Sequence, residues 1–163
     1  MLPELGQFAL ILALLLSAVQ LVLPIVGAHG GNRALMAVAR PAAAGQLVFV
    51  ALAFGILTWA FMSQDFSVAY VAQNSNLLLP WYYRFSAVWG AHEGSLLLWI
   101  LILNVWTFAV AILSRKLPED FMARVLGVLG FVSLGFLLFT VLTSNPFARH
   151  LPALADGNDL NPV

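Results

Sequence analysis

Residues 81–113 read WYYRFSAVWGAHEGSLLLWILILNVWTFAVAIL, an aromatic stretch that leads through His92 and Glu93 into a long apolar run. From Gly94 to Leu113 this run holds no charged residue, and it has the length of about 20 residues that an α-helix needs to cross a bilayer. The stretch therefore predicts a membrane-spanning helix that carries two ionisable side chains at its start.

Three further apolar runs have the same character. The chain is 62% hydrophobic and 9% charged, whereas soluble domains are about 25% charged. We therefore predict an all-α, polytopic membrane protein with four transmembrane helices and a longer outer loop between the second and third helices. The chain is expected to form a single membrane domain over residues 1–163, with spans at about residues 5–28, 42–62, 94–113 and 125–142.

Proline and glycine mark details of these spans. Pro24 is expected to kink or end the first helix, because its ring cannot take part in regular helical hydrogen bonding. Glycines in the second and fourth spans are small enough to let neighbouring helices approach closely. They are Gly45, Gly55, Gly127, Gly130 and Gly135.

Composition also excludes several kinds of site. The chain has no cysteine, which excludes disulfides, thiolate metal sites and CxxC or CxxCH motifs. Lys+Arg and Asp+Glu number 7 each, and the sequence contains no basic patch, so no nucleic-acid partner is predicted. His29 and His150 lack the spacing of metal ligands, so no metal site is predicted.

The distribution of Lys and Arg predicts the orientation. The connections at residues 29–41 and 114–124 together hold five of these residues, whereas the opposite side holds only Arg84 and Arg149. Because Lys and Arg are enriched in cytoplasmic loops, both termini and the aromatic segment are expected outside, in the periplasm of a bacterium. Within the outer loop, residues 66–71 alternate as a short strand would.

The candidate site lies at the start of the third span. If residues 87–99 are helical, Trp89, His92, Glu93 and Trp99 fall along one stripe of that helix. Ionisable residues at the mouth of a membrane span are costly and indicate function by default. Imidazole, carboxylate and flat indole rings together suit the ligation or orientation of a haem, a proton relay, or the capping of a helix start.

Structural explanations exist for the same residues. A carboxylate in a first helical turn, such as Glu93, is favoured by the helix dipole without any ligand. His92 can act as an interfacial amphipathic residue. Trp99 and Trp106 can fill a gap between helices, in which case they have no role in a site.

Several segments carry a family resemblance. The segment WGAHEGSLLLW at residues 89–99 is preceded by NSN at 74–76 and LPWYYRFSAVW at 79–89, and the chain begins MLPELGQFAL. With GNRALM at residues 31–36, LTSNPF at 142–147 and DLNP at 159–162, these segments closely resemble the N-terminal region of CcmF-type cytochrome c biogenesis proteins.

The resemblance implies a haem-handling protein of the bacterial inner membrane. CcmF-type proteins work in the haem lyase step, where haem from a chaperone is attached to apocytochrome c on the outer face of the membrane. Their haem-holding histidines lie further along a longer, many-helix chain. The resemblance therefore implies that this chain is an N-terminal portion, that the axial ligands of haem lie outside it, and that it is not catalytic alone.

Three functions follow from these features. The preferred one is a component of the cytochrome c maturation machinery. The resemblance implies haem as its cofactor, and a haem chaperone, other maturation proteins, apocytochrome c and membrane lipid as its partners. In this function Trp89, His92, Glu93 and Trp99 support a haem or apocytochrome site. The alternatives are a proton- or quinone-linked subunit of a respiratory complex, and a structural subunit that packs another membrane protein.

Overall fold

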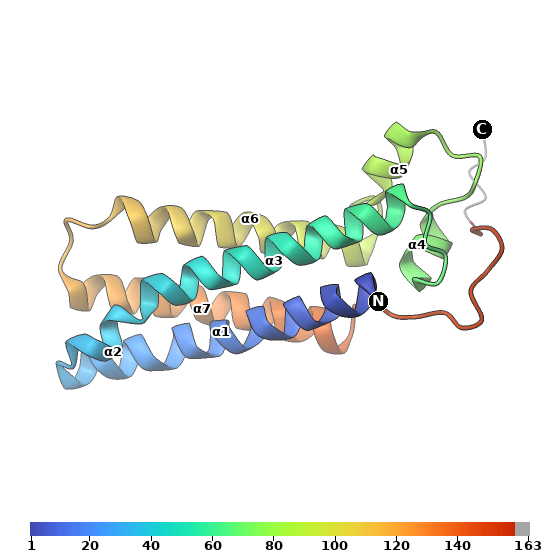
Figure 1. The fold of residues 1–163 in the computed structure, drawn as a ribbon. Helices are drawn as coiled ribbons and strands as arrows, with labels where there is room; N and C mark the ends of the chain where they lie inside the picture. The colour runs from blue at the N-terminus through green and yellow to red at the C-terminus, as the bar shows by residue number, and fades with distance from the viewer. Residues whose placement is uncertain (159–163) are drawn as a thin grey trace.

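The computed structural model describes residues 1–158, and over that range it contains helices and no strands. The DLNP segment lies outside the described residues. The helices are α1 (Leu2–Gly30), α2 (Arg33–Ala37), α3 (Ala39–Met62), α4 (Ala69–Asn74), α5 (Trp81–Ala87), α6 (His92–Leu113) and α7 (Glu119–Leu142) (Figure 1). Because α1, α3, α6 and α7 are long and apolar enough to cross a membrane, the predicted class and number of spans are confirmed.

The four long helices form an antiparallel bundle. Helix α1 packs against α3 and α7, and α6 packs against the same two helices from the other side. Helix α2 and the turn between α6 and α7 lie at one end of the bundle (Figure 1). At the opposite end lie α4, α5 and the start of α1; we call residues 63–91 and 143–158 there the outer cap.

The boundaries differ from the predicted ones at several points. Helix α7 begins at Glu119, not near residue 125, because Pro118 precedes it and two acidic residues occupy its first turn, where the helix dipole favours them. Helix α1 continues past Pro24 to Gly30, so the prediction that this proline ends the helix is wrong. The predicted strand at residues 66–71 is also wrong, since most of that segment is in or beside α4 and only an isolated bridge joins Val68 to Arg149.

Some of the glycines do mediate close packing. A Cβ atom on Gly45 would lie 2.7 Å from a methyl of Leu16, and one on Gly127 would lie 2.6 Å from Ile25. Gly130 packs in the same way against Gln20. In contrast, Gly55 and Gly135 have nothing within 4 Å of the Cβ position among the described residues, so the prediction holds for only part of the set.

A buried polar network crosses the centre of the bundle. Gln46 of α3 donates to Gln20 of α1 at 2.5 Å, and Ser133 of α7 donates to Gln46 at 2.8 Å. Asn104 of α6 donates to Ser133 at 3.3 Å. Interhelical hydrogen bonds in membranes contribute about 0.6 kcal/mol each on average, so the network specifies which faces meet more than it stabilises the bundle.

Candidate functional site at the outer end of the bundle

The predicted site residues lie around the junction of α5 and α6. Helix α6 begins at His92, and residues 88–90 form a turn after α5. The expected helix from residue 87 to 99 is therefore wrong in its first turn. Trp89 lies in the turn and is not part of the stripe, whereas His92, Glu93 and Trp99 are all in α6.

Tyr70 and Gly94 determine this junction. The Tyr70 hydroxyl oxygen lies 3.2 Å from the carbonyl oxygen of Val88 and 3.4 Å from that of Ala91, so it can donate to either. It also accepts the backbone N–H of Ala91 at 3.4 Å. Gly94 is buried directly beneath, where a Cβ atom would be 1.7 Å from the Val88 carbonyl oxygen. The chain can turn into the membrane here because residue 94 has no side chain.

His92 is held in place by the segment that follows α7. Its Nδ1 atom lies 2.8 Å from the hydroxyl oxygen of Ser144, and its ring meets that of Phe139 edge to face with centroids 6.0 Å apart. Ser144 is 5% exposed, whereas His92 is exposed. The Nε2 atom of His92 makes no hydrogen bond with the described residues and is free to meet a ligand.

Ser144 is a contact residue of the candidate site that was not predicted from the sequence. It is 52 positions from His92, so no helical periodicity connects them. The only signal was its place within the LTSNPF segment at residues 142–147. The contact fixes the orientation of the His92 imidazole, so any role of Ser144 in the site would be to position that ring.

The two tryptophans differ in their surroundings. Trp89 is half-buried, with its ring edge to face against Phe85 at a centroid distance of 5.1 Å. Trp99 and Trp106 are 69% and 67% exposed, so they fill no gap between the described helices. Since His92, Trp99 and Trp106 are spaced by seven residues, they share one face of α6.

Glu93 occupies the first turn of α6 and is partly exposed. It makes no hydrogen bond or ion pair with the described residues. Its position agrees with stabilisation by the helix dipole, and its carboxylate remains available. Among the described residues no group of three His, Cys, Asp or Glu side chains could hold a metal ion.

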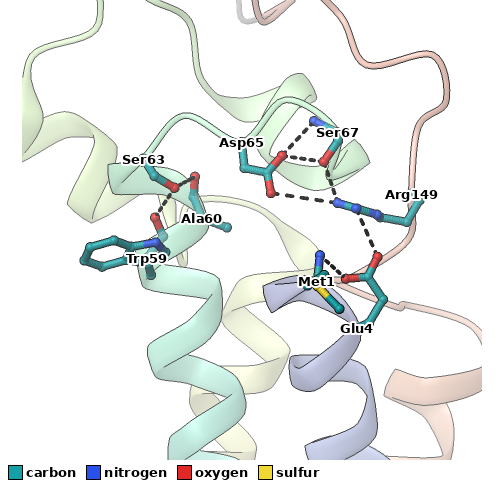
Figure 2. Close-up of polar contacts among 8 residues, drawn as sticks. All are labelled: Met1, Glu4, Trp59, Ala60, Ser63, Asp65, Ser67 and Arg149. Carbon is teal, nitrogen blue, oxygen red and sulfur yellow. Dashed lines mark hydrogen bonds and ion pairs between the residues drawn. The ribbon is translucent and has the colours of Figure 1, made fainter.

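An ionic cluster fastens the outer cap to the bundle, as Figure 2 shows. Arg149 pairs with Glu4 of α1 at 3.0 Å and with Asp65 at 3.8 Å, and the N-terminal amine pairs with Glu4 at 2.7 Å. Ser67 contacts both Asp65 and Arg149. The cluster thereby holds the segment after α7 over the bundle. Arg149 and Ser144 both belong to this segment.

The phenol of Tyr70 predicts a pH-dependent stability. Burial raises the pKa of Tyr70, so the folded chain keeps the phenol proton at a pH where the unfolded chain loses it. This contribution is complete below the ordinary pKa of 10.0 and declines as the pH rises above it. We expect thermal unfolding to show a fall in stability above about pH 10, and a smaller fall in Tyr70→Phe.

Tyr82→Phe is the matched control, since Tyr82 is exposed in the same outer cap. The stability of Tyr82→Phe should fall with pH as steeply as that of the unmodified protein between about pH 9 and about pH 11. An equal slope in the unmodified protein and in Tyr70→Phe would contradict the assignment to Tyr70.

Comparison with known proteins identifies the family. The chain is 68% identical, over its whole length, to the cytochrome c-type biogenesis protein CcmF of Pseudomonas aeruginosa, and 51% identical to CcmF of Escherichia coli. The chain corresponds to the N-terminal portion of a CcmF-type protein. The family described as Cytochrome C assembly protein matches residues 89–163, which include all four predicted site residues.

A solved structure agrees with this CcmF-type assignment. The structure named Cytochrome c Heme Lyase CcmF superposes with a TM-score of 0.85 and 29% identity, over 90% of this chain and 25% of that one. This chain likewise spans 25% of the length of each of the two CcmF relatives named above.

Proposed function

We propose that this chain works in cytochrome c maturation, as part of a membrane subunit that assists the covalent attachment of haem to apocytochrome c. The observation that carries the proposal is the match of the whole chain to proteins named CcmF. Haem is then a substrate, and a haem chaperone, other maturation proteins and apocytochrome c are the partners. The chain by itself is not catalytic, and it belongs to a longer many-helix protein.

The outer end of α6 is the proposed contact for haem or apocytochrome. An imidazole with a free Nε2 atom can donate a hydrogen bond to an anionic propionate group, and exposed indole rings suit a flat, apolar ligand. His92 lies there, whereas His29 lies at the opposite end of α1, where its Nδ1–H donates to the Ile25 carbonyl oxygen at 2.8 Å. We assign His92, Glu93, Trp89 and Trp99 as supporting residues, with the axial ligands of haem outside this chain.

The location follows the same proposal. We assign the chain to the bacterial inner membrane with both termini in the periplasm. Charge supports this orientation, because the end of the bundle with α2 carries five of the seven Lys and Arg residues. The outer cap then faces the compartment in which apocytochrome c would be met.

Complementation tests the proposal. In cells that depend on this chain, His92→Ala is expected to lower covalent cytochrome c by about tenfold, the lower end of the range for residues that support a site. Ser144→Ala should lower it by less, because the imidazole remains and loses only one orienting hydrogen bond. The measurement is haem staining of c-type cytochromes, normalised to the amount of the variant in the membrane. His29→Ala, at the opposite end of the bundle, should leave the level unchanged.

A second variant distinguishes chemistry from structure. His92→Asn keeps an amide near the position of Nδ1, where it can bond to Ser144, but lacks the Nε2 atom. If the only role of His92 is to hold the segment after α7, His92→Asn should restore maturation; if the Nε2 atom meets the ligand, it should not. Normal maturation in His92→Ala and Glu93→Ala together would refute the assignment of both residues.

The alternatives have less support. A proton relay needs ionisable groups at mid-membrane depth, and the buried network there consists of amides and a hydroxyl. A purely structural subunit would use the glycines of α3 and α7. Gly45, Gly127 and Gly130 are occupied by contacts inside the bundle, which leaves Gly55 and Gly135 of that set to pack against another protein. If vesicles reconstituted with the chain showed no proton uptake, the proton relay would be refuted.

A further inference from the structure

The end of the bundle opposite the outer cap contains a cavity of about 240 Å³. It lies between α2, the first turn of α3 and the first two turns of α7. Its lining combines charged and apolar side chains, chiefly Arg33, Met36, Arg40, Glu119, Met122 and Leu126. Pockets for cofactors and drug-sized ligands are roughly 300–1,000 Å³, so this cavity suits a smaller group than haem.

The charged side chains leave one arginine unpaired. Arg33 and Glu119 are 3.9 Å apart and are 88% and 68% exposed, which makes this a weak and easily exchanged ion pair. Arg40 is exposed and makes no hydrogen bond or ion pair with the described residues. The lining therefore presents a guanidinium that is available to an anion, with a second one close by.

The deeper part of the cavity is apolar. Met122 is 3% exposed and Leu126 is 1% exposed, and both belong to a small hydrophobic cluster with Ala39, Ala43 and Ala111. A ligand that fills the cavity must thus combine an anionic group with hydrocarbon. Inorganic phosphate would satisfy only the arginine.

The position of the cavity indicates where such a ligand comes from. The cavity lies at the ends of helices that are long and apolar enough to cross a membrane. In a bilayer of ordinary thickness, the ends of such helices reach the lipid headgroups. Arg115, Lys116 and Arg124 lie at the same end of the bundle, which the positive-inside rule assigns to the cytoplasm. Basic pockets between helices on that side are typical binding sites for anionic headgroups.

We propose that this cavity binds one anionic phospholipid. The phosphate oxygens accept hydrogen bonds from Arg40, with Arg33 turning from Glu119 to join it. The first methylene groups of an acyl chain lie on Met122 and Leu126. The bound lipid would hold α2 and α3 against α7 at the inner end of the bundle. At the outer end, the ionic cluster of Arg149 holds the outer cap against α1.

Native mass spectrometry of the purified chain, titrated with phosphatidylglycerol, tests the proposal. We expect one lipid to bind more tightly than the rest, and Arg40→Gln to weaken that binding by about tenfold, the equivalent of one charge-assisted hydrogen bond. The matched control is Arg115→Gln, an exposed basic residue at the same end that does not line the cavity. It should leave the tight site unchanged.

Two further ligands separate the sources of the phosphate. Phosphatidylcholine, which has no net charge, should not occupy the tight site, and inorganic phosphate should not displace phosphatidylglycerol at equal concentration. Equal binding of both lipids, displacement by phosphate, or an equal loss in Arg115→Gln would each overturn the proposal. The thermal unfolding of lipid-free Arg40→Gln should match that of the unmodified chain, which excludes misfolding as the cause of weaker binding.

Discussion

Gly94→Ala is expected to prevent the outer cap from folding onto the bundle. The added Cβ atom would lie 1.7 Å from the Val88 carbonyl oxygen and 2.6 Å from the Tyr70 hydroxyl. The nearest atom belongs to the backbone of a turn that is itself held by Tyr70, so it cannot move aside without breaking that contact. We expect the free energy of unfolding to fall by about 3 kcal/mol or more, at the upper end of the range for overpacked positions. Thermal unfolding and the yield of folded protein measure it.

Gly90→Ala is the control within the same turn. The Cβ position of Gly90 has its nearest neighbour at 3.4 Å, which is ordinary contact, so this variant should fold normally. Gly55→Ala, in the middle of α3 with nothing near its Cβ position, should be neutral or gain up to about 1 kcal/mol of helix propensity. A Gly94→Ala protein as stable as Gly90→Ala would refute this account of the junction.

Phe147→Ala has an expected effect of similar size. Phe147 is 4% exposed, and its ring lies directly over Gly6 of α1, where a Cβ atom would be 2.4 Å from the ring. Removing a buried phenylalanine ring typically costs about 3–5 kcal/mol. The loss should release the segment that also carries Ser144 and Arg149, so resistance to proteolysis of the outer cap should fall together with the unfolding temperature.

A double-mutant cycle tests whether this contact is the cause. Gly6→Ala alone should destabilise by about 1–3 kcal/mol, because the new methyl pushes on the ring. In the Phe147→Ala background the same change should be neutral or slightly stabilising, since the ring is gone. Strictly additive losses would mean that the two residues do not interact.

Most of the architecture could be predicted from local pattern. The four spans follow from apolar runs, because a chain in a bilayer must satisfy its backbone hydrogen bonds internally and long helices do so. The start of α7 was predicted late, because the charged residues Glu119 and Asp120 read as a loop by hydropathy although their acidic groups favour a helix start. The short α4 was missed for a similar reason, since its alternating residues resemble a strand.

The candidate site could be predicted only in part. His92, Glu93 and Trp99 belong to one helix, as their spacing indicates, but Trp89 lies outside it because the turn at residues 88–90 ends α5 first. Ser144 could not be found from the sequence. The hydrogen bond to His92 depends on the return of the chain through α7, and local periodicity contains no information on that path.

The sequence by itself determined the membrane class, the number of spans, the charge asymmetry between the two ends and the aromatic entrance to the third span. These properties depend on the transfer of side chains between water and lipid, which each residue contributes almost independently. Only the tertiary structure decided which polar groups meet: Gln20 with Gln46, Arg149 with Glu4, and His92 with Ser144. Such contacts join distant segments and require the packed bundle to bring them within a few ångströms, so no local pattern in the chain encodes them.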